Sequence, residues 1–446
     1  MKRREFVKKA ATLTAGSVVM PYLLPTGRLF AKTNAPLAEH VVFVIFGGGL
    51  RQQDSILQRY LADSQNFNSE GNILTNILEG AAPTSKIAYG TTPAGQSSGS
   101  QPIPRLLSQT IQKQGTIFAE MRAISGGHYG GLNSLITGSP VQGQGLKVRP
   151  INPTLFEYGR RFGGFKATDT WFIGNTIGNS LPLLNSSKHP DFGLTYGGNF
   201  FAPNITFGSE GYATLAKARI YHPQEELEPI YTMKNFLDNS FNIKKGDLPG
   251  IKNTDAERTQ IKEFIASTFQ RQQNGQIPMP PVNSGDGSTM GYAAEVLRVF
   301  KPKILVVNMS GIDGCHSNFT GYLQSMHRAD HALGFLWDYI QNQIPEISGK
   351  TIMCFVPECG RNLKPNPILD ANDWYGYDHG DANSLRVFGG MVGKNVPSNL
   401  MVGSEINPIG KVTDFNLTIA EILGYKSDVV NAGIIDPEAK SLFDRI

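Results

Sequence analysis

Cysteine and charged residues are both scarce in this chain. Its 446 residues include three cysteines, and 17% of the residues are charged. Three cysteines cannot form a disulfide scaffold. The sequence also has no Cys-x-x-Cys pair, no haem attachment motif and no Gly-x-Gly-x-x-Gly after a predicted strand. A redox role is therefore ranked below the two functions considered at the end of this section.

Long hydrophobic runs are also missing. The longest apolar stretch runs from Ala10 to Leu24, which is short of the roughly 20 residues that a membrane helix needs. The net charge of +4 comes partly from five basic residues near the N-terminus: Lys2, Arg3, Arg4, Lys8 and Lys9. We therefore expect no stable membrane span and no nucleic-acid partner.

The N-terminal segment has the pattern of an export signal. Arg3-Arg4-Glu5-Phe6-Val7-Lys8 resembles the twin-arginine consensus, and the apolar stretch that follows ends at Pro25. We predict a twin-arginine signal peptide over residues 1–31, cleaved after Ala31, with the twin-arginine translocation machinery as a partner. The mature protein would be periplasmic or secreted. The alternatives are an uncleaved anchor or a chance basic start.

Several short apolar runs are typical of buried parallel strands, because they lack alternation. Helical patterns separate some of them, over Thr254 to Gln273, which opens with a Thr254–Glu257 capping box, and over Tyr322 to Ile340. This order predicts one α/β domain over 39–446, with a mostly parallel central sheet and helices on both faces. The predicted strands are His40 to Phe46, Thr116 to Ile124, Ile304 to Met309, Thr351 to Val356 and Leu385 to Val392.

The middle of the chain has a different composition. Residues 140–250 are rich in glycine, asparagine, proline and aromatics, and Gln276 to Ser288 has the composition of a loop. We therefore predict a loop-rich insertion at about 140–290, beside the sheet. Thr91 to Gln101 is predicted to be another loop.

Polar clusters lie next to several predicted strands, where ligands bind in open α/β sheets. Asp313 and His316 follow the run Ile304 to Met309 and could converge on zinc or manganese. The alternative is a loop capped by its own side chains. Asp378 and His379 precede the run Leu385 to Val392; His379 could ligate a metal, and Asp378 could ligate it or orient the histidine.

Two further clusters follow predicted strands. Glu358 could be a metal ligand or a base, and Arg361 could hold an anion; the alternative is a salt bridge between the two. His128 would project from the glycine-rich turn Ser125 to Gly131, where backbone N–H groups are exposed. The alternative there is an ordinary tight connection.

The roles of the three cysteines and of one histidine pair are left with alternatives. Cys315 and Cys359 could form a disulfide, act as soft metal ligands, or be unrelated thiols. Cys354 lies inside an apolar run and is predicted to belong to the core. His327 and His331 share a helix face, where a packed or solvated face is favoured over a zinc site.

The ordered set of motifs resembles the alkaline phosphatase and sulfatase superfamily. Within it, the chain is most similar to an exported branch called domain of unknown function 1501. The resemblance spans roughly residues 40–425 and consists of short motifs: Gly47 to Gly49, Leu135 to Gly138, Asp313 to His316, Glu358 to Arg361, Asp378 to Gly380, Gly389-Gly390, Thr413-Asp414 and Thr418 to Gly424.

This resemblance implies an alkaline-phosphatase-like fold and a divalent metal such as zinc, manganese or calcium. Three departures matter. Gly48 stands where the metal-binding Asp of the first strand is expected, His128 stands at the nucleophile position, and Glu358-Cys359 replaces an Asp-His pair. One metal site is retained, while the second site and the nucleophile are lost.

Two functions compete. The first is a metal-dependent hydrolase acting on a phosphate or sulfate ester or another anionic small molecule. In this interpretation Asp313, His316 and His379, with Asp378 beside them, hold the cation. Glu358 or His128 serves as a base or as a further ligand, and Arg361 binds the anion. The alternative is a catalytically degenerate binding or assembly protein on the same scaffold, whose aromatic middle binds a glycan or a protein.

Overall fold

The computed structural model describes residues 35–59, 71–82, 102–141, 148–175, 178–206, 251–282 and 284–446. It also describes the backbone of two short strands that pair antiparallel, β1 (Tyr22–Leu23) and β2 (Leu29–Phe30). The twin-arginine motif, the cleavage position and the predicted loop at 91–101 lie outside the described residues. The chain divides into Met1–Pro36 and Leu37–Ile446, and the second unit contains the fold considered below.

An eight-stranded sheet forms the centre of this unit, in the order β10-β4-β9-β8-β3-β7-β5-β6. All neighbouring pairs are parallel except the two that involve β9. The predicted α/β class with a mostly parallel sheet is confirmed. The strands are β3 (His40–Phe46), β4 (Gly115–Arg122), β5 (Thr170–Gly174), β6 (Asn199–Phe201), β7 (Ile304–Met309), β8 (Thr351–Pro357), β9 (Arg386–Gly393) and β10 (Leu400–Val402).

The three central strands are buried on both faces. Every residue of β3, β7 and β8 is buried, which explains their uninterrupted apolar sequences. Phe46 at the end of β3 lies opposite Met309 of β7 and Pro357 of β8. The loops that follow these strands therefore leave the sheet at the same level.

The prediction that Leu385 to Val392 forms a parallel strand was wrong in direction. This segment forms β9, which runs antiparallel to both β4 and β8. An apolar run indicates burial and carries no information about strand direction, so the sequence could not show this. Because β9 is reversed, the segment before it, with Asp378 and His379, reaches the edge where the parallel strands end.

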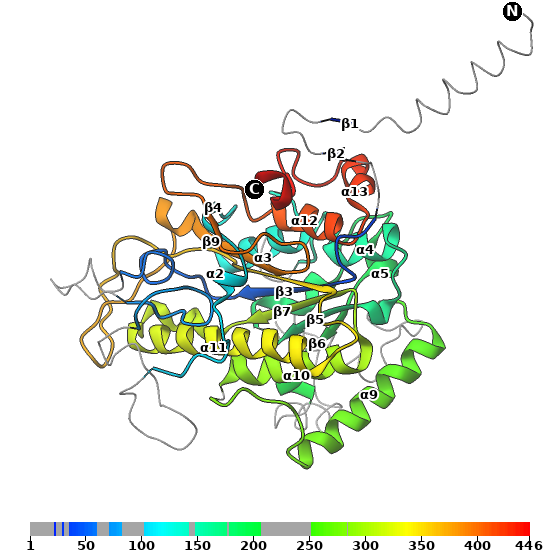
Figure 1. Cartoon of the computed structure of the whole chain (residues 1–446), viewed down its shortest axis with the longest axis horizontal. Coiled ribbons are helices and arrows are strands. Elements are labelled where there is room, and N and C mark those ends of the chain that lie inside the picture. Colours follow the sequence, from blue (N-terminus) through cyan, green and yellow to red (C-terminus); the bar gives the residue numbers. More distant parts are fainter. Residues whose placement is uncertain are drawn as a thin grey trace, which may run out of the picture. The chain divides into compact units, whose positions relative to one another are not determined.

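Helices cover both faces of the sheet, as predicted (Figure 1). On one face α10 (Gly285–Phe300) packs against α11 (Phe319–Gln343) and against β7. On the other, α12 (Asp414–Ile422) packs against α3 (His128–Thr137) and α4 (Leu155–Phe162). The remaining helices of the described residues are α2 (Ile111–Gln114), α5 (Gly193–Tyr196), α6 (Pro203–Thr206), α9 (Asp255–Gln273) and α13 (Lys426–Ala432), with short 3-10 helices η2 (Ala167–Asp169), η3 (Gly178–Asn185), η5 (Gly311–His316), η6 (Ala382–Leu385) and η7 (Leu442–Arg445).

The two predicted long helices are confirmed. Helix α9 begins with the predicted capping box, in which Thr254 and Glu257 each accept a hydrogen bond from the backbone of the other. Helix α11 extends the predicted Tyr322 to Ile340 by about one turn at each end. Among the helices that the structure describes, none combines the length and the apolar character needed to cross a bilayer.

Part of the predicted insertion is built into the sheet. Strands β5 and β6 extend the sheet beyond β7, and α4 begins with its own capping box, formed by Thr154 and Glu157. These strands have five and three residues, too short to stand out as apolar runs in an aromatic and glycine-rich segment. The predicted loop Gln276 to Ser288 ends earlier than expected, because Ser284 caps α10.

Candidate metal centre

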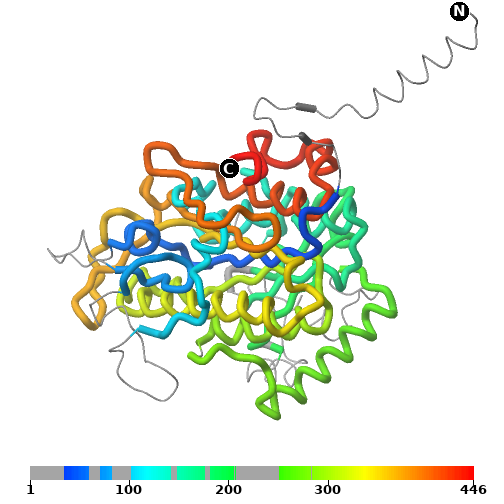
Figure 2. Tube along the Cα trace, in the orientation of Figure 1, coloured from blue at the N-terminus to red at the C-terminus, as the bar shows by residue number. Residues whose placement is uncertain are grey.

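Four loops meet where the central strands end. They are the loops after β3, β7 and β8 and the loop that leads into β9. Figure 2 shows the blue trace after β3 beside the gold and orange trace of residues 360–385. The backbone carbonyls of Asn362 and Leu363 accept hydrogen bonds from Arg51, and Gln53 bonds to Asn383.

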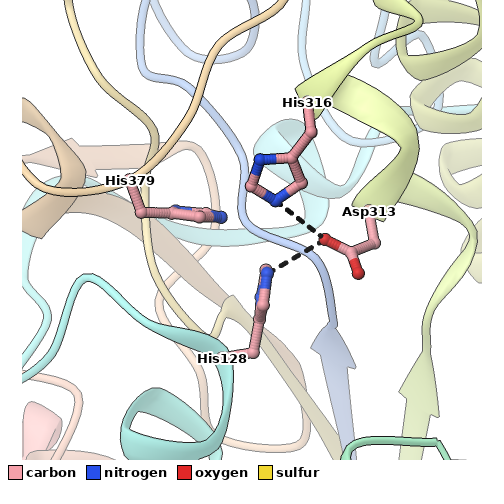
Figure 3. A group of neighbouring side chains, drawn as sticks. All are labelled: His128, Asp313, His316 and His379. Carbon is pink, nitrogen blue, oxygen red and sulfur yellow. Dashed lines mark ion pairs between the residues drawn. The ribbon is translucent and has the colours of Figure 1, made fainter.

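Four side chains from three segments that are far apart in the sequence converge at this point. They are His128, Asp313, His316 and His379, and one potential ligand atom from each lies within 4.8 Å of the others. The Nε2 atoms of His128 and His316 lie 3.0 and 3.6 Å from Oδ1 of Asp313 (Figure 3). His379 enters from the opposite side, with a ring nitrogen directed between the other two rings. The predicted ligands Asp313, His316 and His379 are thus brought together, and His128 joins them.

Each of the three imidazoles has its other nitrogen held by an oxygen atom. The Nδ1 atoms of His128 and His316 lie 2.6 Å from carboxylate oxygens of Glu358 and Asp378, respectively. Nδ1 of His379 lies 2.9 Å from the carbonyl oxygen of Gly360. These acceptors assign the proton of the neutral ring to Nδ1 and leave Nε2 to face the centre.

This donor set fits a divalent cation. Nε2 of His379 is buried and has no hydrogen-bond partner among the described residues, and a buried polar atom without a partner calls for a ligand. Three imidazole nitrogens and one carboxylate oxygen form a common ligand set for zinc and related metals.

Helix α3 places His128 by packing directly against the loop after β8. His128 is the first residue of the helix, after the cap residue Gly127. A Cβ atom at Gly131, one turn later, would lie only 2.3 Å from the carbonyl oxygen of Glu358. Glycine at 131 therefore allows the close approach that brings the ring of His128 to the Glu358 carboxylate.

Gly48 stands where the resemblance places a metal-binding aspartate, and the fold leaves no room for a side chain at this position. It has a φ of +110°, and a Cβ atom there would lie 2.4 Å from the backbone nitrogen of Asp313. Its N–H donates to Oε1 of Glu358 at 2.7 Å. The backbone of η5 occupies the space that a side chain at position 48 would need.

The protonation states of Asp313 and His128 depend on each other. Burial alone would lower the pKa of His128, but hydrogen bonds to Asp313, Cys359 and Glu358 outweigh it and raise this pKa to about 12. Burial would raise the pKa of Asp313, but the hydrogen bond and charge of His128 and the charges of Arg361 and His316 lower it to about 2. In the metal-free protein a proton on His128 balances the carboxylates, and a metal would displace it.

His379 and Glu358 respond mainly to burial. Burial and the positive charges of Arg361 and His128 lower the pKa of His379 to about 3, so this ring is neutral and able to ligate. The carboxyl group of Glu358 is fully enclosed, and burial raises its pKa even though His128 and the N–H of Gly48 oppose the shift.

Three of the predicted site residues lie outside the ligand set. Glu358 and Asp378 each hold a histidine by its Nδ1 atom, so they orient ligands. Arg361 has no exposed side-chain surface and donates to the backbone oxygens of Gly48, Gly49 and Tyr377. The expected anion-binding role of Arg361 requires exposure to solvent, which the structure does not give it.

The three cysteines are free and buried, so Cys315 and Cys359 do not form a disulfide. Burial raises the pKa of Cys359 to about 11, so its thiol is protonated at neutral pH. Its Sγ atom lies 3.7 Å from Nδ1 of His379, and Cys359 also forms a second group of possible ligands with His128 and Glu358. Cys354 lies in the buried strand β8, as predicted.

The histidine pair on α11 belongs to a packed helix face. His327 bonds through Nδ1 to the carbonyl of Ile73 at 2.7 Å and accepts from the N–H of Ile103 at 2.8 Å. His331 is also buried. The favoured interpretation of this pair as structural holds.

Comparison with known proteins gives structural similarity only. No family profile and no curated protein matches the sequence. A protein of the alkaline phosphatase superfamily from Vibrio parahaemolyticus is 11% identical over 92% of this chain and 73% of its own, with a TM-score of 0.40. Phosphonate monoester hydrolase of Agrobacterium radiobacter is 12% identical over 87% and 74% (TM-score 0.43), and alkaline phosphatase from the Antarctic bacterium TAB5 is 11% identical over 87% and 99% (0.40).

Asp286 is a site residue that the sequence did not reveal. From the first turn of α10 its carboxylate accepts hydrogen bonds from the N–H groups of Ser310 and Gly311, at 3.0–3.2 Å. These N–H groups open the helix η5 that carries Asp313 and His316. No sequence signal links Asp286 to a loop 24 residues away, because only the packing of α10 against β7 brings them together.

Proposed function

We propose that this chain is an exported, metal-dependent hydrolase of the alkaline phosphatase and sulfatase superfamily, in the domain of unknown function 1501 branch. Its substrate would be a phosphate or sulfate ester. One observation carries the metal site: three imidazoles have their Nδ1 atoms held by oxygens while their Nε2 atoms converge beside Asp313. Such second partners are the usual support of metal-bound histidines.

The ligand set favours zinc or manganese over calcium, which prefers six to eight oxygen ligands. A zinc or manganese ion bound there would polarise an ester oxygen and lower the pKa of a bound water toward about 7. The side chains of Asp313 and His316 are 42% and 40% exposed, so the site is open to solvent on their side. Substrate would approach the centre there.

The residues around the centre support a one-metal form of the chemistry. His128 stands at the nucleophile position, but its Nδ1 contacts Glu358 and its Nε2 faces the ligand set. The attacking group would therefore be a water molecule. The backbone of η5 fills the space beside Gly48, where the usual second ion would need a carboxylate.

Metal content and hydrolysis, measured on the same purified protein, test the proposal. We expect one zinc or manganese ion per chain and hydrolysis of aryl phosphate or aryl sulfate. His316→Ala should lose both, while His189→Ala should keep both, because His189 packs beside Phe192 on another part of the domain. A wild-type protein that binds no metal contradicts the proposal. Metal binding without hydrolysis favours the alternative binding or assembly protein.

Export is proposed from the sequence of the first 31 residues. Replacing Arg3 and Arg4 together by lysine should keep the protein in the cytoplasm with its signal uncleaved, because the twin-arginine machinery reads the arginine pair. Fractionation of cells that express the two forms measures this. Equal export of both forms would rule out the twin-arginine route.

A further inference from the structure

Arg361 lies beneath the metal ligands and bonds to several loops at once. Its side chain has no exposed surface. Nε donates to the carbonyl oxygen of Gly49 at 3.1 Å, and Nη1 donates to that of Tyr377 at 2.9 Å. Gly49 belongs to the loop after β3, and Tyr377 lies two residues before His379.

The second terminal nitrogen of Arg361 reaches a third loop. Nη2 donates to the carbonyl oxygen of Gly48 and lies 3.3 Å from Oδ1 of Asp313 and 3.4 Å from the carbonyl oxygen of Asp313. Arg361 itself follows β8, three residues after Glu358. One guanidinium therefore joins the loops that carry Gly48, Asp313, His379 and the carboxylate behind His128.

Only a guanidinium can make this set of contacts. Its planar fork directs donors toward different loops at fixed angles, whereas a lysine ammonium presents three donors from a single point. Its positive charge also faces the carboxylate of Asp313, so the buried cation has a counter-ion.

We propose that Arg361 is a positioning residue that sets the arrangement of the metal ligands before the ion binds. It fixes Asp313 directly, through the side-chain oxygen that faces His128 and His316. It fixes His379 indirectly, through Tyr377. Arg361 does not touch substrate. This inference rests on the proposed metal site and adds to it the residue that preorganises the site.

Zinc affinity tests the proposal, with Arg386 as a matched control. The Arg386 side chain is 11% exposed and binds the buried Glu120 through two nitrogens, and it has no described contact with Gly48, Asp313 or Tyr377. Arg361→Lys should raise the zinc Kd by about tenfold or more, as measured by competition with a chromophoric chelator. Arg386→Lys should destabilise the fold and leave this Kd near the wild-type value.

Hydrogen exchange in the wild-type chain gives a second measurement, which does not depend on a folded variant. Metal-free protein should already protect the amides of residues 311–316 and 376–379. Equal zinc affinities of Arg361→Lys and wild type, or protection of these segments only after zinc is added, would overturn the inference. If the wild-type chain binds no zinc, the proposed function itself fails, which is a separate outcome.

Discussion

At the scale of single residues, the histidines of the centre depend on the oxygens behind them. Asp378 holds His316, Glu358 holds His128, and the carbonyl of Gly360 holds His379. An imidazole can rotate about two side-chain bonds, so an oxygen at Nδ1 fixes both the ring orientation and the tautomer. In the proposed metal site the two carboxylates would therefore support metal affinity without contacting the ion.

We predict that Asp378→Asn weakens zinc binding by about tenfold. The amide oxygen can still accept from Nδ1 of His316, but without the negative charge that makes this ring a better ligand. Asp428→Asn, on the exposed side of α13, should leave the affinity unchanged. Calorimetric titration of zinc into the three proteins measures this. An unaltered affinity of Asp378→Asn would show that His316 is held by other contacts.

The carboxyl group of Asp286 leads to a prediction of how the stability of the fold depends on pH. Burial raises its pKa to about 6, although the N–H groups of Gly311 and Ser310 partly oppose the shift. In the unfolded chain the pKa is about 3.9, so between these values the folded protein holds a proton that the unfolded chain has released. This contribution to stability is complete below about pH 4 and is lost as the pH rises through 6, and it amounts to about 3 kcal/mol.

Asp286→Asn should remove this contribution, because the amide cannot titrate. The free energy of unfolding of the wild type, relative to the variant, should therefore fall between pH 4 and pH 7. Urea unfolding of both proteins across that range measures the difference. Parallel pH profiles for the two proteins would show that the carboxyl group is not shifted upward.

At the scale of elements, the sequence indicated five of the eight strands of the main sheet and the two longest described helices, α9 and α11, but not the strand directions. The apolar runs marked β3, β7 and β8, and the Thr254–Glu257 pair marked the start of α9. The reversal of β9 depends on pairing with β4 and β8, which are distant in the sequence. Short β5 and β6 were missed because three to five residues give too weak a pattern.

Gly48 and Gly314 form a matched pair on the loops around the centre. Gly48→Ala should cost about 2 kcal/mol or more, because the residue has a positive φ and its new methyl group would overlap the backbone of Asp313. Gly314→Ala meets no atom within 4 Å and should change stability by less than about 0.5 kcal/mol. Thermal unfolding of both variants tests this. Equal effects would mean that the loops move apart easily.

At the scale of the whole molecule, the site exists only because these four loops and the start of α3, which follows β4, share one edge of the sheet. The sequence predicted this edge and named His128, Asp313, His316 and His379 as site residues. It offered His128 as a base or a further ligand without deciding between them, and it could not show that Glu358, Asp378 and Arg361 lie behind the four clustered side chains. Those roles depend on distances of a few ångströms between segments up to 313 residues apart.

Removal of the metal should therefore lower the free energy of unfolding of the whole domain. Zinc at about 100 times its Kd should add about 2.7 kcal/mol to the free energy of unfolding, because the ligands come together only in the folded chain. Adding a chelator should lower the Tm of the wild type and leave that of His316→Ala unchanged. A chelator-insensitive Tm in both proteins would argue against a bound ion.

X-ray absorption at the zinc edge of the zinc-loaded protein tests the central claim most directly. It reports the atoms around the ion and their distances. The account predicts only nitrogen and oxygen neighbours at about 2.0–2.2 Å, with the outer scattering of three imidazoles. A sulfur neighbour at about 2.3 Å would place Cys359 in the ligand set, and that result, or fewer than three imidazoles, would contradict it.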